Sequence, residues 1–458
     1  MPAISDHSTL SAKAVTFTEA MPQQFVGECP DAVDVVVIGA GIIGVCTAWQ
    51  LAKSGVRVLL CEKGRVAGEQ SSRNWGWIRQ LGRDPAELPI MMESRRIWQS
   101  LTADVGEDLG YREQGIIYLA RSEKKMVQRE SWLEVARQHQ LETLMIDRAA
   151  VEKQIQGLPG QWCGGIYTPG DGRAEPWLAV PAIARAAQRD GVIIRDQCAV
   201  RSIEQTNGQV SAVITESGPV RCERVVLAGG AWSSMFAANM GLRLPQLTVR
   251  STVVATTAMP SVYPGNAADE ELAFRRRQDG GYTLALTDLT NHFVGPDTFR
   301  FMRSFTPALI SDWQSFRFGA APADFPDGWR TPRRWTPDET SPFERNRVLN
   351  PLPCRRAVDR MLRRFKDRFP ALDDVGIAHS WAGMIDTMPD VVPVIDHVPQ
   401  VGGLTIATGF SGHGFGIGPG AAKVVAQLVE NQPVSHDLSR FRFNRFSDGT
   451  PIDLGPAL

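Results

Sequence analysis

Residues 34–62 read DVVVIGAGIIGVCTAWQLAKSGVRVLLCE, a pattern that predicts a buried strand, a helix and a second buried strand. Gly39, Gly41 and Gly44 form Gly-x-Gly-x-x-Gly where the first strand turns into the helix. The first glycine permits a tight turn, the second lets the backbone approach a pyrophosphate, and the third lets helix and strand pack closely. Glu62 ends the second strand, where a carboxylate can accept hydrogen bonds from both ribose hydroxyls of an adenosine. The stretch therefore predicts a parallel sheet that binds a dinucleotide, with accidental turn glycines as the alternative.

The acid at position 62 also bears on which dinucleotide is bound. A carboxylate would repel the 2′-phosphate of NADP, but it does not separate NAD from FAD. Nicotinamide enzymes usually continue directly into another helix after the second strand, whereas here the segment 71–80 (SSRNWGWIRQ) follows. The choice between NAD and FAD therefore depends on motifs farther along the chain.

The composition is that of an ordinary globular protein. The chain has 458 residues, of which 43% are hydrophobic and 22% charged, and 49 basic against 50 acidic residues give a net charge of −1. This length predicts about two to three domains with a core that needs no disulfide or metal. The charge balance argues against a general nucleic-acid or anionic-membrane binder.

The seven cysteines include no Cys-x-x-Cys pair and are odd in number, which is typical of a reduced compartment. Residues 1–33 lack the basic start and apolar stretch of a signal peptide. No apolar run reaches the roughly 18 residues that a membrane-spanning helix needs. We expect a loose N-terminal extension at 1–33, no transmembrane helix and a cytoplasmic location.

Three further motifs follow the first in a fixed order. They are VVLAGGAWS at 225–233, WAGMIDTMPDVVPVID at 381–396 and GFSGHGFGIGPG at 409–420, the last directly before an apolar helix. Together with the glycine-rich turn and segment 71–80, they resemble the D-amino acid oxidase-like superfamily of FAD enzymes, which includes sarcosine oxidase, glycine oxidase and the D-amino acid dehydrogenases. The resemblance covers about residues 34–435 and is specific for the superfamily but not for a substrate.

The resemblance implies an α/β fold whose two domains alternate along the chain. A Rossmann-type FAD-binding domain is interleaved with an antiparallel-sheet α+β substrate domain, and the substrate binds where the two meet. The expected limits are an extension at 1–33, FAD-binding parts at 34–110, 165–240 and 372–440, substrate parts at 111–164 and 241–371 with an insertion at 319–353, and a C-terminal tail at 441–458.

The resemblance also implies which residues contact FAD. The turn at 409–420 is expected at the flavin's pyrimidine edge, where a helix N-terminus stabilises the negative charge of reduced flavin, and a plain glycine-rich loop is the alternative. His413 is expected near the flavin without acid–base work. The expected contacts are Gly39, Gly41, Ile42, Ile43, Gly44, Glu62, Lys63, Ser71, Ser72, Arg73, Asn74, Gly76, Trp77, Val200, Ala228, Gly229, Gly230, Trp232, Gly383, Gly409, Gly412, His413, Gly414, Phe415 and Gly416.

Three side chains are candidates for the catalytic site. By resemblance, Arg79 holds a substrate carboxylate by a bidentate pair, and an ordinary salt bridge is the alternative. Asp386 could bind an ammonium group or take its proton, or could be a strand-end residue that caps a turn. His292 could face the flavin's other side, or could be a satisfied histidine of a sheet. Trp75 and Trp77 could wall an amine site or pack in the core.

The sequence departs from sarcosine oxidase-like members at two points. Gly416 stands where those members have a lysine that helps to bind carboxylate. They also attach flavin through a cysteine near the stretch that holds Ala382 and Gly383 here, whereas this chain has no cysteine after Cys354. We therefore expect non-covalent FAD and a changed carboxylate pocket.

The resulting prediction is an FAD-dependent oxidoreductase that oxidises the C–N bond of an amine or amino acid, with oxygen or an electron carrier as acceptor. The imine product then hydrolyses. The alternatives are FAD-dependent oxidation of a 2-hydroxy acid or alcohol phosphate, an NAD-dependent dehydrogenase, and a non-catalytic flavin-binding protein with 319–353 as its docking element. The substrate, its stereochemistry and the oligomeric state stay open.

No nucleic-acid or metal partner is expected. The arginines at 275–277 and those of the basic helix at 355–364 are interpreted as a solvated face, because acids are interleaved with bases along the chain. No His/Cys/Asp cluster has metal-ligand spacing, and no Gly-x-Ser-x-Gly hydrolase turn is present.

Overall fold

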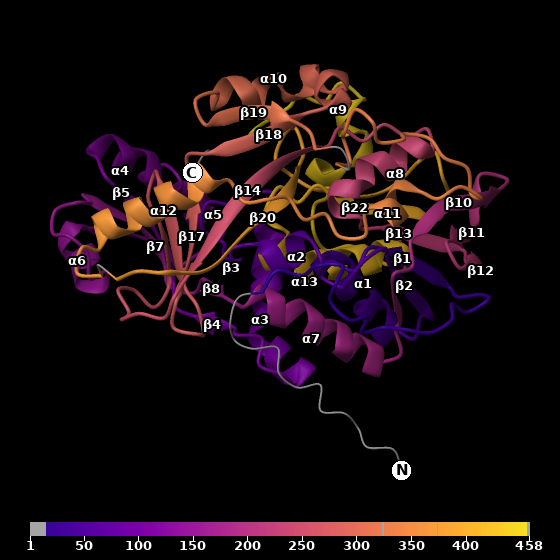
Figure 1. Ribbon diagram of the computed structural model, residues 1–458, viewed down its shortest axis with the longest axis horizontal. Helices are drawn as coiled ribbons and strands as arrows, with labels where there is room; N and C mark the ends of the chain where they lie inside the picture. The colour runs from indigo at the N-terminus through magenta and orange to yellow at the C-terminus, as the bar shows by residue number, and fades with distance from the viewer. Residues whose placement is uncertain (1–14, 323–324, 373, 456–458) are drawn as a thin grey trace, which may run out of the picture.

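The glycine-rich stretch forms the centre of a six-stranded sheet. The computed structural model describes residues 15–322, 325–372 and 374–455 (Figure 1). In spatial order the strands are β21 (Val394–His397), β22 (Leu404–Thr408), β13 (Arg224–Leu227), β1 (Val35–Ile38), β2 (Val58–Glu62) and β9 (Ile193–Asp196). All neighbours pair in parallel except β21, which runs antiparallel to β22 at one edge. A parallel sheet needs cover on both faces, which explains its continuous apolar strands.

Helices cover one face of this sheet and a small sheet covers the other. The helices are α1 (Ile42–Lys53), α3 (Leu88–Val105), α7 (Pro176–Arg189) and α13 (Gly414–Val429). The small sheet consists of β10 (Val200–Thr206), β11 (Gln209–Thr215) and β12 (Gly218–Arg221). Val35 and Val37 of β1 belong to the core beneath the helices, while Val36 belongs to the core beneath the small sheet. This alternation is the period of two that a strand imposes.

The second large sheet has ten strands, most of them antiparallel to their neighbours. Its path is β19 (Phe316–Ala320), β18 (Thr290–Val294), β14 (Leu247–Thr256), β17 (Tyr282–Leu286), β16 (Leu272–Arg276), β15 (Asn266–Ala268), β5 (Ile116–Ala120), β7 (Gly164–Thr168) and β6 (Leu144–Asp147). The tenth strand, β20 (Ile377–Thr387), pairs with β14 along its length. Helix α12 (Arg355–Arg368) packs on this sheet through Met361 and Phe365. The predicted α/β fold class is confirmed.

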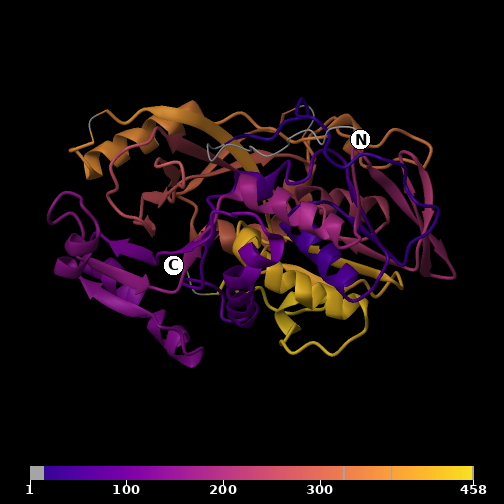
Figure 2. The same ribbon diagram turned by 90° about the horizontal axis from the view of Figure 1, so that it is seen from below.

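The chain alternates between the two sheets. The first sheet takes strands from 35–62, 193–227 and 394–408, and the second takes strands from 116–168 and 247–387. Seen from below, the purple strands and helices of the 116–168 part form the left end of the molecule, and the yellow C-terminal helix lies near its middle (Figure 2). The limits of the two domains stay a prediction.

Short elements complete the fold. A three-stranded sheet joins β3 (Trp77–Ile78), β8 (Gly172–Arg173) and β4 (Arg112–Glu113). The short helices are α2 (Gln70–Arg73), α4 (Glu123–Glu130), α5 (Leu133–Gln138), α6 (Arg148–Gln154), α8 (Ser233–Asn239), α9 (Pro296–Arg300), α10 (Met302–Ser311) and α11 (Pro342–Arg345). The 3₁₀ turns are η1 (Gly230–Trp232), η2 (Ser439–Phe441) and η3 (Phe443–Phe446). Residues 1–14 of the predicted extension and 456–458 of the predicted tail lie outside the described residues. The described part of the extension is not loose as predicted, because Phe17 and Phe25 are 4% and 1% exposed and belong to the core beneath the helices.

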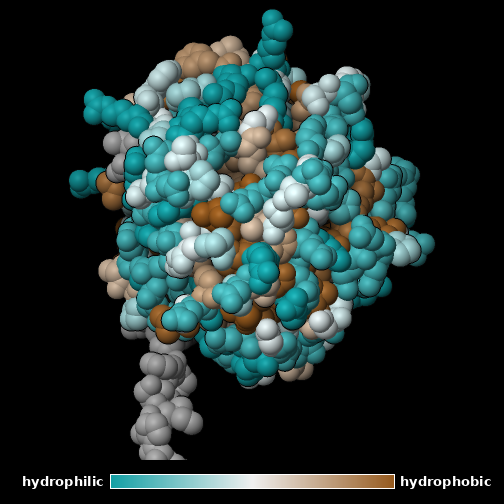
Figure 3. Space-filling view, turned by 90° about the vertical axis from the view of Figure 1, so that its right-hand side faces the viewer, coloured by the Kyte–Doolittle hydropathy of each residue, from teal (hydrophilic) through white to brown (hydrophobic). Residues whose placement is uncertain are grey.

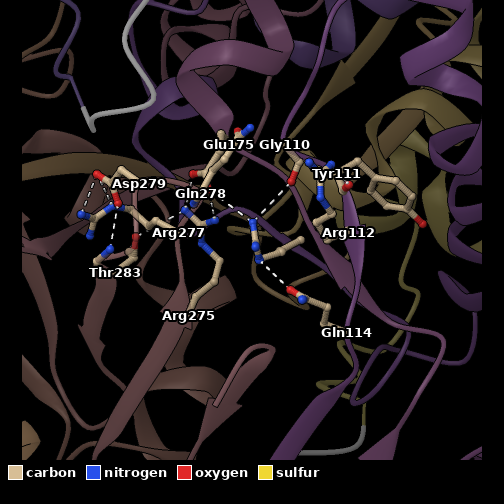
Figure 4. Close-up of polar contacts among 12 residues, drawn as sticks. Gly110, Tyr111, Arg112, Gln114, Glu175, Arg275, Arg277, Gln278, Asp279 and Thr283 are labelled. Atoms are coloured by element: carbon tan, nitrogen blue, oxygen red, sulfur yellow. Dashed lines mark hydrogen bonds and ion pairs between the residues drawn. The ribbon is translucent and has the colours of Figure 1, made fainter. Parts of the chain in front are cut away.

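The prediction that the arginines at 275–277 form a solvated face is wrong. Arg275 and Arg277 are 0% and 2% exposed, so they do not form a solvated face. Arg275 donates from both Nη atoms to Glu175, at 3.1 and 2.8 Å, and Arg173 and the Gln278 amide also donate to that carboxylate (Figure 4). Glu175 directly precedes α7, so this buried pair joins the ten-stranded sheet to a helix of the first sheet. Nothing in the sequence pointed to this partner, because Glu175 lies 100 positions before Arg275.

The face at the right of Figure 1 is mainly hydrophilic, with hydrophobic atoms in narrow bands between polar side chains (Figure 3). None of the helices in the described ranges is long and apolar enough to cross a membrane.

Candidate active site

A cavity of about 370 Å³ opens at the carboxyl ends of four strands of the first sheet. Ile38, Glu62, Leu227 and Thr408, at or near the ends of β1, β2, β13 and β22, all line it. The stretch Gly383–Asp386 of β20 lines it as well, so both sheets contribute. The carboxyl end of a parallel sheet is where ligands bind in such folds.

The N-terminus of α1 faces this cavity. Gly39 has a φ of +101°, and a Cβ there would lie 2.6 Å from the Ala228 carbonyl oxygen. A Cβ on Gly44 would lie 1.9 Å from the Gly39 carbonyl oxygen, so this glycine sets the contact between helix and strand. No N-cap side chain covers the helix start, and the first residues of α1 line the cavity. The Ile42 amide donates to the Ser71 hydroxyl at 2.9 Å, and the other amides of this first turn suit an anion such as a pyrophosphate.

Glu62 and Lys63 lie beside this helix start. The Glu62 carboxylate accepts from the amides of Ala40 and Gly64 at 2.8 and 2.9 Å, and burial raises its pKa. Lys63 donates to Glu69 at 2.6 Å, so its charge is paired within the fold. Glu62 stands where the sequence predicts an acid for the ribose hydroxyls.

The N-terminus of α13 faces the cavity from another side. The helix begins at Gly414 without a capping side chain, and the preceding Gly412 has a φ of +82°. The carbonyl oxygen of Gly416 accepts from Ser94 at 2.7 Å and from the Trp98 indole at 3.0 Å. A Cβ on Gly416 would lie 3.0 Å from the Trp77 carbonyl oxygen, so a lysine here would need the neighbouring backbone to shift. Two helix N-termini thus open on one cavity.

Asp386 lies in the lining on β20 and is 3% exposed. Its Oδ2 accepts from the Gly409 amide at 2.8 Å, from Gln246 at 3.2 Å and from the Thr408 hydroxyl at 3.4 Å. Burial raises the pKa of this carboxyl. These bonds hold the side chain in place, and a raised pKa suits a group that exchanges protons closer to neutral pH.

Arg79 lies in the lining and contacts the Gly-His-Gly turn. One of its Nη atoms donates to the Leu81 carbonyl, and the other lies 3.4 Å from Nε2 of His413. Burial lowers the pKa of His413 to about 4, so its ring is neutral at neutral pH. Arginine has no acceptor, so Nε2 accepts and the ring proton resides on Nδ1, which lies 3.2 Å from Glu87.

Arg83 and Glu87 complete this corner of the cavity, and the sequence interpretation missed both. Arg83 is 1% exposed, lines the cavity, and donates to the carbonyl oxygens of Arg79 at 3.1 Å and His413 at 3.2 Å. Its Nη1 has no hydrogen-bond partner and lies 3.6 Å from Glu87. The spacing of four residues on a predicted helix start was the available signal, because it permits an ion pair.

Aromatic side chains wall the same end of the cavity. The rings of Trp75 and Trp77 meet edge to face with centroids 5.7 Å apart, and Tyr118 lies 6.2 Å from Trp77. All three line the cavity, together with Phe410 and Phe415. Tyr118 comes from β5 of the ten-stranded sheet, which no local motif could reveal.

Part of the predicted insertion at 319–353 also belongs to the site. Phe343 of α11 lines the cavity and packs edge to face against Trp232, with ring centroids 5.8 Å apart. The Leu349 amide donates to Glu69 at 2.9 Å. Phe343 therefore places this part of the segment in the wall of the cavity.

Most of the predicted site residues meet at the cavity. The lining includes Arg79, Asp386, Gly39, Gly41, Ile42, Ile43, Glu62, Lys63, Ser71, Arg73, Asn74, Trp77, Val200, Ala228, Gly229, Gly230, Trp232, Gly383, Gly412, His413, Gly414 and Phe415. The predicted contacts Gly44, Ser72, Gly76, Gly409 and Gly416 do not line the cavity.

His292 is the candidate that the structure does not bring to the cavity. Its Nδ1 lies 2.9 Å from the Thr248 carbonyl oxygen, and its Nε2 lies 2.9 Å from the Thr298 hydroxyl. The ring is 5% exposed and does not line the cavity. His292 is therefore a satisfied histidine of a sheet, and its catalytic assignment is corrected.

The residues around the cavity have the chemistry that FAD binding requires. The open N-terminus of α1 suits a pyrophosphate, Glu62 suits an adenosine ribose, and the open N-terminus of α13 suits an electron-rich ring edge. Gly39 and Gly41 leave the cavity free of side chains where the dinucleotide backbone must approach. Among the residues described, no group of three His, Cys, Asp or Glu side chains could hold a metal ion.

Comparison with known proteins agrees with this chemistry. The sarcosine oxidase subunit beta of Rhizobium meliloti (strain 1021) is 26% identical over 92% of this chain and 90% of its own length. The mitochondrial dimethylglycine dehydrogenase of Rattus norvegicus is 27% identical over 56% of this chain, and the match spans only 30% of that longer protein. The structure of L-amino acid deaminase from Proteus myxofaciens in complex with anthranilate superposes with a TM-score of 0.90 and 30% identity, covering 95% of this chain and 98% of that one.

The family model confirms the resemblance found in the sequence motifs. The DAO model, described as FAD dependent oxidoreductase, matches residues 34–428, which include both helix N-termini and both sheets. This chain belongs to the DAO family of FAD dependent oxidoreductases.

Proposed function

We propose that this chain uses FAD to oxidise the C–N bond of an amino acid or of a related amine. The observation that carries the proposal is that Arg79 and Asp386 line the same cavity as the two open helix N-termini. A cation for a carboxylate and a buried carboxyl for an amine proton thus lie beside the place that suits a flavin. The relatives named for sarcosine, dimethylglycine and L-amino acids support this substrate class.

The cofactor would be held without a covalent bond. The amides at the start of α1 would hold the pyrophosphate, Glu62 the ribose, and the start of α13 the flavin's pyrimidine edge. FAD, when bound, supplies the acceptor for the two electrons that leave the substrate. The sequence has no cysteine after Cys354, so none is adjacent in the chain to Ala382 and Gly383, where sarcosine oxidase-like members attach the flavin.

The protein would orient the substrate and control its proton. The Arg79 guanidinium would hold the carboxylate, and the aromatic wall of Trp75, Trp77 and Tyr118 would exclude water and accept an apolar side chain. Asp386 would take the proton of the ammonium group, since only a neutral amine is oxidised readily. The related deaminase was solved with anthranilate, an aromatic amine with one carboxylate, which suits this arrangement.

Predictions about location, domain limits and the electron acceptor are kept as part of the proposal. We assign the protein to the cytoplasm and retain the two interleaved domains with their predicted limits. Oxygen or an electron carrier would reoxidise the enzyme, and admission of air after anaerobic reduction separates the two.

Arginine substitutions test the proposal. In Arg79→Met, half-maximal reduction of the flavin should require at least tenfold more amino acid, while Arg96→Met, an exposed arginine of α3 outside the cavity, should match the parent. Oxidation of a primary amino acid should give a 2-oxo acid and ammonia, and the 2-oxo acid is detected by hydrazone formation. Reduction by 2-hydroxy acids alone would favour a hydroxy acid oxidase, and bound FAD that no small molecule reduces would favour a binding protein.

A further inference from the structure

One part of the cavity wall belongs to neither of the two large sheets. It is the segment 341–349, which we call the strap; it contains the four-residue helix α11, and its Phe343 lines the cavity. Among the described residues, the backbone–backbone hydrogen bonds of the strap stay within its own turn. Side-chain contacts therefore have to hold it against the rest of the molecule.

Arg347 joins the strap to the small sheet. Its two Nη atoms donate to the two carboxylate oxygens of Glu216 at 2.5 and 2.6 Å, and Nη1 also donates to the Lys63 carbonyl oxygen at 3.0 Å. Glu216 follows β11, and the side chains of the pair are only 16% and 17% exposed. A bidentate pair sheltered in this way is stronger than an ordinary surface ion pair.

Glu344 joins the strap to the same small sheet. Its carboxylate accepts from Nη2 and Nε of Arg201 on β10, at 2.6 and 3.1 Å. The same carboxylate accepts from the amide and the hydroxyl of Ser341 at 2.7 and 2.6 Å, which closes a capping box on α11. Two ion pairs thus lie within four residues of Phe343 in the chain.

The strap contacts the side of the cavity that we assign to the adenosine. Lys63, next in the chain to Glu62, donates to the carbonyl oxygens of Asn346 and Arg347 at 2.8 and 3.0 Å. A Cβ on Gly64 would lie 1.9 Å from the Arg347 carbonyl oxygen, so the strap backbone lies directly against this turn. Because Glu62 suits the ribose, an adenosine bound there would lie beside the strap.

We infer that the strap retains FAD: it closes the adenosine side of the cavity, and the cofactor leaves only when Arg347 and Glu344 separate from the small sheet. Since the cofactor is proposed to be held without a covalent bond, its rate of release then depends on how often this wall opens. The inference concerns the FAD site alone and holds for any substrate.

Arg347→Met tests this inference. Methionine retains part of the length of the side chain but cannot pair with Glu216. If opening of the strap precedes release, loss of this charge-assisted pair should raise the open population, and with it the rate of FAD release, about tenfold. Arg345→Met is the matched control, because Arg345 is an exposed arginine of the same segment, and it should release FAD at the parent's rate.

The assay dilutes the FAD-loaded protein into excess ADP, which prevents rebinding, and follows the recovery of free-flavin fluorescence. Hydrogen exchange of the same FAD-loaded samples, measured by mass spectrometry, reports the opening of the strap. In Arg347→Met the amides of 341–349 should exchange faster than in the parent, whereas those of α12, on the other sheet, should not change.

Two results would overturn the inference. One is release by Arg347→Met within twofold of the parent. The other is faster release without faster exchange in the strap, because the ion pair would then act on the cavity without opening it.

Glu216→Gln carries the same test if Arg347→Met does not fold. The glutamine can still accept the Ala199 amide, which donates to Glu216 at 2.6 Å, and it can still accept one bond from Arg347. A neutral acceptor keeps roughly half the strength of a charged one, so release should rise about threefold. Release at the parent's rate would overturn the inference.

Failure of the proposed function has a different signature. FAD release is measured without substrate, so a protein whose flavin no amino acid or amine reduces can still show the predicted release rates. A flavin that an amino acid reduces, together with unchanged release in both variants, would leave the function standing and the strap without this role.

Discussion

Substitution of Gly44 by alanine should weaken FAD binding by about tenfold. The new Cβ would lie 1.9 Å from the carbonyl oxygen of Gly39, whereas such contacts are essentially never shorter than 3.0 Å. Helix α1 and the turn must therefore separate by at least 1.1 Å, although α1 is wedged between α7 and α13. Overpacking of this kind costs about 1–3 kcal/mol, and about 1.4 kcal/mol corresponds to a tenfold change in affinity. The shift moves the amides that we assign to the pyrophosphate.

The assay is titration of the FAD-free protein with FAD, followed by the quenching of flavin fluorescence, together with urea unfolding of both forms. Gly319→Ala is the matched control, because a Cβ there meets nothing closer than 3.7 Å and lies on β19, outside the cavity lining. The control should bind FAD with the parent's affinity. Binding by Gly44→Ala within twofold of the parent would refute the proposed contact between helix and cofactor.

Three further predictions concern buried charges. Glu175→Gln should cost roughly 3–5 kcal/mol of unfolding free energy in urea, because it leaves Arg275 buried without its acid, while Glu134→Gln on an exposed pair should cost roughly 0.3 kcal/mol; equal losses would contradict the prediction. Burial raises the pKa of Asp171 to about 6, so the folded state holds this proton longer than the unfolded state and stability should fall as pH rises from about 4 to about 6. Asp171→Asn should flatten that fall, as measured by urea midpoints across this range, and an unchanged slope would show that other groups cause it. Asp386→Asn should slow anaerobic flavin reduction most at pH values above the raised pKa of this carboxyl and below the pKa of the amine, where Asp386 is ionised and the substrate still carries the proton; equal rates in both proteins at all pH values would exclude its role.

The cofactor half of the site could be predicted from the sequence because its residues are local. Gly39, Gly44 and Glu62 lie within one strand–helix–strand unit, and backbone geometry dictates their spacing. The glycines before α13 are similarly determined by the need for an open helix start. Local sequence patterns were therefore enough to predict the two helix N-termini. The structure shows that both face one cavity.

The substrate half could not be predicted in the same way, since its residues come from distant parts of the chain. Tyr118 and Phe343 reach the cavity from β5 and α11, and no local pattern relates them to the glycine-rich turn. From the sequence, Arg275 was expected at the surface, whereas in the fold it is buried and paired with Glu175. Both ring nitrogens of His292 have partners that only the fold determines: Nδ1 contacts the Thr248 carbonyl through the pairing of β18 with β14, and Nε2 contacts the Thr298 hydroxyl of α9.

The most direct test of the account is anaerobic mixing of the purified yellow protein with an amino acid, followed by the flavin absorbance. The account predicts that an amino acid with an apolar side chain and one carboxylate bleaches the flavin, and that the 2-hydroxy acid of the same carbon skeleton does not. A matched amine without the carboxylate should bleach it more slowly, because Arg79 then has no partner. Bleaching by the hydroxy acid but not by the amino acid, or no bleaching by any of the three, would contradict the account.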